Sequence, residues 1–122
     1  MENKTERLVR GFANSVFSIM KWGKMPVSRF KVGNMSQYRG YAMLTGVNTS
    51  FVIISTNPSV YPDNATEQDF WYCVLHELIH IYMAYNGYSI QEAFGHGKKF
   101  KQLAKLIEIK TDGEWKSRRI LK

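Results

Sequence analysis

The chain has 122 residues, of which 44% are hydrophobic, and a formal net charge of +7, as expected for one globular domain with a real core. Its first residues include acidic side chains, and no apolar run approaches the ~18 residues of a membrane span, so we expect neither a signal peptide nor a transmembrane helix. Cys73 is the only cysteine, which excludes an internal disulfide and fits a reducing, cytoplasmic setting.

The N-terminal half of the chain predicts one helix followed by short strands. Apolar side chains at three- and four-residue spacing between residues 5 and 22 predict an amphipathic helix, which Gly23 and Pro26 end. Three β-like stretches follow, separated by turn residues, and we expect them to form a small three-stranded antiparallel sheet. They cover residues 27–32, 38–45 and 51–55. The last of them is apolar on both faces, so we expect it to be the most covered strand.

The C-terminal half predicts two longer helices. Thr66 and Asp69 have the spacing of a capping box, in a weaker acidic form, which indicates a helix start. The elements expected are a helix over residues 67–85, a short turn over 89–94 and a last helix over 98–109. Residues 111–122 show little pattern. We therefore expect one domain over residues 1–110, followed by a basic C-terminal tail over 111–122.

The stretch V-L-H-E-L-I-H-I-Y, residues 74–82, places two histidines and a glutamate in a helix that is otherwise apolar almost all round. Polar groups are costly to bury unless they are paired or bound to a metal. His76 and His80 are four residues apart, so their imidazoles lie on one face of the helix and can converge on one point. Glu77 projects beside that pair. This is the H-E-x-x-H arrangement, in which two histidines bind zinc and the glutamate is the general base.

The third and last histidine, His96, is the natural third ligand. A catalytic zinc takes three protein ligands and keeps one position open. Fifteen residues separate His80 from His96, which is enough for the chain to turn back, and Gly95 and Gly97 let the backbone approach closely. The alternative is chance, with two core histidines and one exposed loop histidine. Cys73 is a rival ligand, but it lies roughly 10 Å from His80 along the helix, which favours a small buried thiol.

H-E-L-I-H at 76–80, followed by G-H-G at 95–97 and then Phe100, resembles the SprT-like zinc metallopeptidases, which include the Spartan DNA–protein crosslink proteases. The strand that ends in Asn57-Pro58 is also similar, and the resemblance covers roughly residues 5–109. It implies a zincin-like α+β fold with an N-terminal helix, a small three-stranded antiparallel sheet, a buried zinc-binding helix and a C-terminal helix. H-E-x-x-H alone occurs in many metalloprotease families, whereas its combination with G-H-G-x-x-F is much more specific.

The resemblance implies that His76, His80 and His96 bind one zinc ion in a zinc-dependent endopeptidase. Zinc would lower the pKa of a bound water and polarise the scissile carbonyl, and Glu77 would take the proton of that water and deliver it to the leaving amine. A hydrogen-bond donor for the oxyanion or the substrate is also expected. The candidates, for each of which a structural role is the alternative, are Tyr38, Arg39, Tyr41 and Tyr88.

The chain departs from the family in having no ligands for a second zinc site. Many members continue into a second zinc-binding segment, which in Spartan-type proteins helps to engage DNA. With one cysteine and every histidine assigned, we expect a minimal catalytic domain, of a size that suggests a phage or mobile element. Two functional alternatives remain: a nucleic-acid-associated binding module with little hydrolysis, against which the intact Glu77 argues, and a protease specific for one regulatory partner.

The positive charge is concentrated at the C-terminal end, where residues 98–122 carry a net charge of +6 and residues 1–97 only +1. One interpretation is a solvated helix face and a solubilising tail. The other is a surface that follows the phosphates of single-stranded DNA without sequence preference, with Trp115 stacked on an unpaired base. The candidate contacts are Lys98, Lys101, Lys105, Trp115, Lys116, Arg118 and Arg119.

Overall fold

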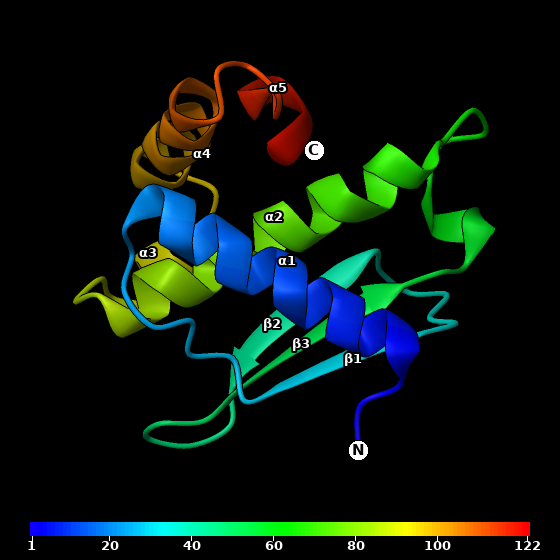
Figure 1. Cartoon of the computed structure of the whole chain (residues 1–122), viewed down its shortest axis with the longest axis horizontal. Helices are drawn as coiled ribbons and strands as arrows, with labels where there is room; N and C mark the ends of the chain where they lie inside the picture. The colour runs from blue at the N-terminus through cyan, green and yellow to red at the C-terminus, as the bar shows by residue number, and fades with distance from the viewer.

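The computed structural model describes residues 1–122 and shows an α+β fold, in which helices pack on one face of a three-stranded sheet (Figure 1). In chain order the elements are α1 Lys4–Met20, β1 Arg29–Gly33, β2 Gly40–Leu44, β3 Ser50–Ser55, the 3-10 helix η1 Pro58–Val60, α2 Glu67–Tyr85, α3 Ile90–Ala93, α4 Lys98–Lys110 and α5 Ser117–Ile120. The α+β prediction is confirmed. None of the helices combines the length and apolar character that crossing a membrane requires.

The sheet is mixed, so the prediction of a purely antiparallel sheet is wrong. β3 lies in the centre, antiparallel to β2 and parallel to β1. Residues 34–39 therefore cross over the end of β3 instead of forming a tight turn. Ser55 fixes this crossing, because its backbone N–H donates to Arg39 O at 2.7 Å and its hydroxyl donates to Met35 O at 2.6 Å. The central place of β3 agrees with its apolar side chains on both faces, of which Val52 and Ile54 are fully buried.

The outer edge of β1 is covered by two carboxylates from the N-terminal segment. Glu2 accepts a hydrogen bond from the backbone N–H of Phe30 at 2.8 Å, and Glu6 accepts one from Val32 at 2.9 Å. Both N–H groups belong to alternate residues of an edge strand and would otherwise be open to pairing with another chain. The two carboxylates therefore close this edge and fix the start of α1 against β1.

This attachment also decides which face α1 buries. Leu8 and Ile19, which belong to the predicted apolar spacing, remain 57% and 49% exposed. The polar Glu6 is buried instead, because the backbone N–H groups of Asn3 and Val32 both donate to its carboxylate. The side chains that α1 buries are Glu6, Val9, Ala13, Val16, Phe17 and Met20.

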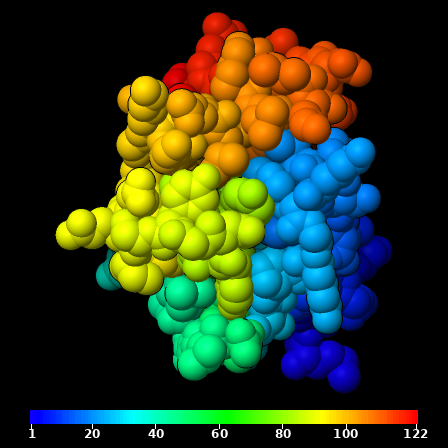
Figure 2. Space-filling view, turned by 90° about the vertical axis from the view of Figure 1, so that its left-hand side faces the viewer, coloured from blue at the N-terminus to red at the C-terminus, as the bar shows by residue number.

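Residues 111–122, whose sequence shows little pattern, are folded against the rest of the chain. Trp115 packs between two aromatic rings, with ring centroids 5.5 Å from Phe12 and 4.9 Å from Tyr72. Ile120, in α5, is fully buried. In the space-filling view orange residues near the C-terminus border the blue surface of the N-terminal residues (Figure 2). The chain end is therefore part of the domain that builds the site.

We predict that Glu6→Gln lowers the free energy of unfolding by about 1–3 kcal/mol at pH 7, because one carbonyl oxygen cannot accept both N–H groups. The hydrogen bonds from Asn3 and Val32 hold the pKa of Glu6 below its ordinary value. A lowered pKa means stability that is present above the unfolded-state pKa and lost as the pH falls through the folded-state pKa. Urea unfolding at pH 7 and pH 3 should therefore show a difference between variant and wild type that shrinks in acid. Glu114→Gln is the control, since Glu114 is exposed, and an equal loss in both variants would contradict the assignment.

Candidate metal centre

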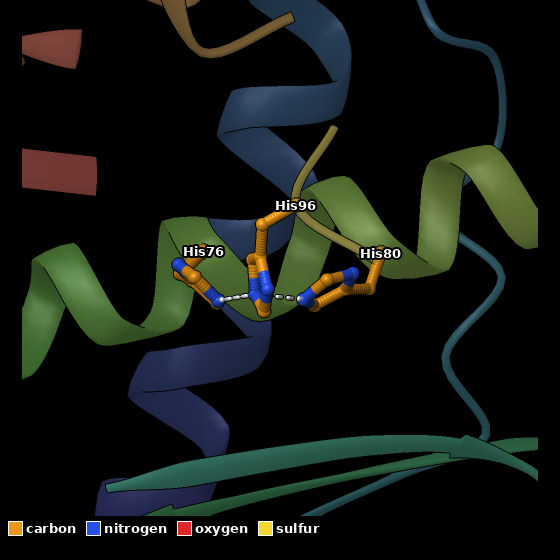
Figure 3. Close-up of side chains that lie close together, drawn as sticks. All are labelled: His76, His80 and His96. Atoms are coloured by element: carbon orange, nitrogen blue, oxygen red, sulfur yellow. Dashed lines mark hydrogen bonds between the residues drawn. The ribbon is translucent and has the colours of Figure 1, made fainter. Parts of the chain in front are cut away.

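α2 carries the first two histidines through the middle of the core. Its long apolar side chains, including Leu75, Leu78 and Ile79, are fully buried and hold the helix in place. Thr66 and Asp69 form the capping box predicted at its start. His76 and His80 follow one turn apart, and their rings converge on the ring of His96 beside α2 (Figure 3).

The ring nitrogens of His76, His80 and His96 converge on one point. The three ligand atoms all lie within 4.8 Å of one another. His96 Nε2 is 2.9 Å from His76 Nε2 and 3.2 Å from His80 Nε2, and Figure 3 shows the His96 ring between the other two. For a tetrahedral metal with nitrogen ligands at ~2.0–2.1 Å, neighbouring nitrogens are about 3.3 Å apart. The cluster therefore has the dimensions of a three-histidine metal site.

The return of His96 depends on α3 and on Gly95. α2 ends at Tyr85 with Asn86 as its C-cap, Ser89 caps α3, and the chain then turns back toward α2. A Cβ at Gly95 would lie 2.7 Å from the carbonyl oxygen of Gln91, so a side chain there would force the turn open. The expectation that Gly97 is needed in the same way is wrong, because the space around it is open.

The outer nitrogens of two histidines are held by backbone carbonyls. His76 Nδ1 lies 2.7 Å from Ile120 O, and His80 Nδ1 lies 2.7 Å from Ala93 O. A carbonyl can only accept, so each Nδ1 carries the proton and each Nε2 presents a lone pair. The sequence has no signal for these two partners, because any residue can supply a carbonyl.

This protonation pattern tests whether a metal ion fits. Two Nε2 lone pairs, from His76 and His80, point at His96 Nε2, which has at most one proton to donate. Hydrogen bonds within the cluster therefore leave one of these two nitrogens, of which His80 is buried and His76 half-buried, without a partner in the chain. A cation at the centre satisfies all three nitrogens at once, so the residues present fit a metal ion.

The apolar ring of Phe100 packs against all three histidines. Its ring centroid is 4.8 Å from His76, 4.7 Å from His80 and 5.1 Å from His96, and the side chain is fully buried. Burial lowers the pKa of His76 and lowers the pKa of His80 to about 4. Both imidazoles are therefore neutral near pH 7, which is the form that binds a metal.

Glu77 lies beside the cluster and has no hydrogen-bond partner within the chain. Its carboxylate lines a cleft of about 770 Å³, together with His76. Burial raises the pKa of Glu77 to about 8. Gly40 sits directly against it, because a Cβ at Gly40 would be 2.9 Å from Glu77 Oε2 and 2.7 Å from Cys73 Sγ. A buried carboxyl group that faces a cleft without a partner is a strong candidate for chemistry.

Other candidates from the sequence are placed as follows. Cys73 lines the cleft, but burial raises the pKa of its thiol to about 12, and it is not part of the histidine cluster. Arg39 also lines the cleft, whereas the three tyrosines named with it do not. The rings of Tyr38 and Tyr41 pack against each other, with centroids 5.6 Å apart. Tyr88 packs against the hydrophobic core.

The basic residues divide into two groups. Most have exposed side chains: Lys98, Lys101, Lys105, Lys116 and Arg118. Arg119 is different, because it donates to Gln68 Oε1 at 3.0 Å and to Asp69 Oδ1 at 3.3 Å, and its guanidinium lies 4.2 Å from the ring centroid of Tyr72. Arg119 thus attaches α5 to α2, next to the carbonyl that holds His76.

We predict that Arg119→Ala weakens metal binding by roughly 10–100-fold, the usual effect of losing support for a ligand. Loss of the contacts to α2 should free α5 and with it the Ile120 carbonyl. Arg118→Ala is the matched control, because Arg118 is the neighbouring residue of the same type and is exposed. Competition with a chromophoric chelator measures the affinity, and equal affinities of the two variants would contradict this role of α5.

Comparison with known proteins places the chain in a family. No curated protein and no solved structure matches it. The family model of the SprT-like family matches residues 6–118, which include α1, the sheet, α2 and all three histidines. The match extends past the predicted domain end into the segment that contains Trp115. The chain therefore belongs to the SprT-like family.

Proposed function

We propose that this protein is a zinc-dependent endopeptidase. The observation that carries the proposal is the combination of three converging histidine nitrogens with an unpartnered carboxyl group, Glu77, which lines a cleft together with one of them, His76. Membership of the SprT-like family supports it. Three imidazole nitrogens, with one ligand position left for water or substrate, are the donor set of catalytic zinc sites.

The three imidazole ligands favour zinc and similar late transition metals over calcium and magnesium. Imidazole nitrogens suit zinc and other late transition metals, whereas calcium and magnesium prefer oxygen ligands. In the proposed site His76, His80 and His96 would hold the ion. Bound there, zinc would supply Lewis acidity toward the scissile carbonyl and toward a water molecule.

Glu77 is proposed as the general base. It takes the proton of the attacking water and later delivers it to the leaving amine. Burial raises its pKa to about 8, which makes it a stronger base than an exposed glutamate, and a cation among the neighbouring histidines would keep it ionised near neutral pH. The close packing of Gly40 limits the movement of the Glu77 carboxylate and excludes water from one side of it.

One edge of the sheet is closed and the other is free, and the free edge supports the binding of an extended peptide substrate. The edge of β1 is closed by Glu2 and Glu6. β2 pairs only with β3, so its outer edge is free, and it begins at Gly40, beside Glu77. An extended peptide can add to a free sheet edge through backbone hydrogen bonds. This would lay the peptide backbone next to the base.

The nucleic-acid alternative has less support. The exposed lysines of α4 remain available for phosphates. Trp115, however, packs against Phe12 and Tyr72, which argues against the stacking role expected for it, and Arg119 is committed to α2. Action on DNA-associated proteins, and specificity for one regulatory partner, remain narrower forms of the same proposal.

We predict that Glu77→Gln retains one zinc ion per chain and loses peptidase activity by about 10²-fold or more, because the amide cannot accept the proton. Glu67→Gln is the control, since Glu67 is exposed in the first turn of the same helix. Elemental analysis gives the zinc content, and an internally quenched peptide mixture gives kcat/KM. Loss of zinc together with activity in Glu77→Gln would make Glu77 a ligand or a structural residue instead, and full activity would exclude it as the base.

A further inference from the structure

Arg39 is a cation in the cleft without a carboxylate partner. The cleft contains two acidic side chains besides the cations. Asp69 is paired with Arg119 at 3.3 Å, and Glu77 has no ion pair. Arg39 is half-buried and lies next to Gly40 in the sequence, at the point where the crossing segment enters β2. A half-buried guanidinium whose charge is not balanced within the chain is open to an anionic ligand.

The guanidinium of Arg39 is held in one orientation. Its Nε donates to Val60 O at 2.8 Å, and its Cζ lies 5.8 Å from the ring centroid of Tyr61. Tyr61 is itself fixed, because its hydroxyl donates to Ser55 O at 2.7 Å. The Arg39 backbone carbonyl accepts from the Ser55 N–H. The end of β3 therefore anchors both the backbone and the side chain of Arg39, and the two terminal nitrogens, Nη1 and Nη2, have no partner in the chain.

The position of Arg39 relative to Glu77 defines what it can reach. Gly40 packs against both Glu77 and Cys73, and Cys73 lies one turn of α2 before Glu77. Arg39 precedes Gly40, so its charge lies along the cleft from the base rather than at it. One residue of an extended peptide spans about 3.3 Å. Because Arg39 and Glu77 line the same cleft, a group bound by Arg39 would belong to a residue near the bond that is cleaved.

We propose that Arg39 is a specificity-determining residue that binds a carboxylate of the peptide substrate next to the scissile bond. The proposal rests on the endopeptidase function proposed above and adds the substrate class: peptides with an acidic side chain at that position. A free C-terminal carboxylate is the other source of the same group, and because its acceptance would mean cleavage near a chain end, it is tested separately. The planar guanidinium fork matches a carboxylate with two parallel hydrogen bonds. A pre-oriented fork loses little side-chain freedom on binding, which favours such a ligand further.

The experiment compares peptides that differ only in this carboxylate. In the first set of internally quenched peptides, either Asp or Asn occupies one of the two positions on either side of the cleavage site. In a second set the peptide ends at one of these positions in either a free or an amidated C-terminus. Wild type should prefer the carboxylate by about 10–100-fold in kcat/KM, through KM. Arg39→Gln should lose the preference, and Arg39→Lys, which keeps the charge without the fork, should retain part of it.

Arg29→Gln is the matched control. Arg29 also lies over an aromatic ring, 5.6 Å from Phe51, but it is exposed on β1, at the other end of the strand order from β2. This variant should keep the full carboxylate preference. No preference in wild type, or the same preference in Arg39→Gln, would overturn the proposal. The side-chain and terminus sets tell which source of the carboxylate the site accepts.

A binding measurement separates this inference from the proposed function. Fluorescence anisotropy of the labelled Asp and Asn peptides with wild type and Arg39→Gln needs no hydrolysis. Binding that favours the Asp peptide and depends on Arg39, without cleavage of any peptide, would support the carboxylate site and contradict the peptidase. A competition measurement covers the nucleic-acid alternative. If a short single-stranded oligonucleotide displaces the labelled Asp peptide at a lower concentration than an unlabelled acidic peptide does, Arg39 binds phosphate, and the inference is overturned.

Discussion

The rest of this structure depends on one constraint in the histidine cluster. The Nε2 lone pairs of His76 and His80 both point at the ring of His96, and the buried ring of Phe100 packs against all three. The carbonyls of Ala93 and Ile120 place the proton of His80 and of His76 on Nδ1, so the inner nitrogens cannot satisfy one another. Phe100 excludes water from below. Without a cation, the half-buried Nε2 of His76 and the buried Nε2 of His80 would compete for a single donor, and leaving a buried acceptor unpaired is costly. A cation would remove that cost and would connect three distant parts of the chain.

The coupling runs through the C-terminal segment as well as through α2. Arg119 attaches α5 to the start of α2, and Ile120 connects α5 to His76. The same segment lines the cleft, as do Arg39 and Gly40. Metal binding, the position of α5 and the width of the cleft would therefore be linked, because a shift of α5 would change both the support of His76 and the space beside Glu77.

The sequence predicts the parts of the site that depend on local spacing. The four-residue interval between His76 and His80 on an apolar helix, and the Gly-His-Gly segment that returns to it, could be recognised because helix geometry fixes where such side chains lie. The strand order could not be predicted, because the turn residues after β1 suit a hairpin as well as a crossing over the end of β3. Only the apolar character of both faces of β3 indicated its central place.

The parts that the sequence missed depend on long-range contacts. Carbonyl partners such as Ile120 O leave no trace in residue type, and residues 111–122 are too short and too basic to show the periodicity that would have revealed α5. Trp115 was expected in a free tail, but it packs against rings from α1 and α2. From the sequence, Arg39 was one of four candidates for a hydrogen-bond donor. It enters the cleft because residues 34–39 cross over the end of β3, and the predicted antiparallel sheet had no such crossing.

X-ray absorption at the zinc edge, on protein purified without added chelator, reports directly on the proposed three-histidine site. We predict one zinc ion per chain with three imidazole nitrogens and one further light ligand at ~2.0–2.1 Å, and the multiple-scattering pattern of histidine rings. Sulfur ligation would place Cys73 in the site instead. A folded, homogeneous protein that binds no metal with these three histidines would contradict the account.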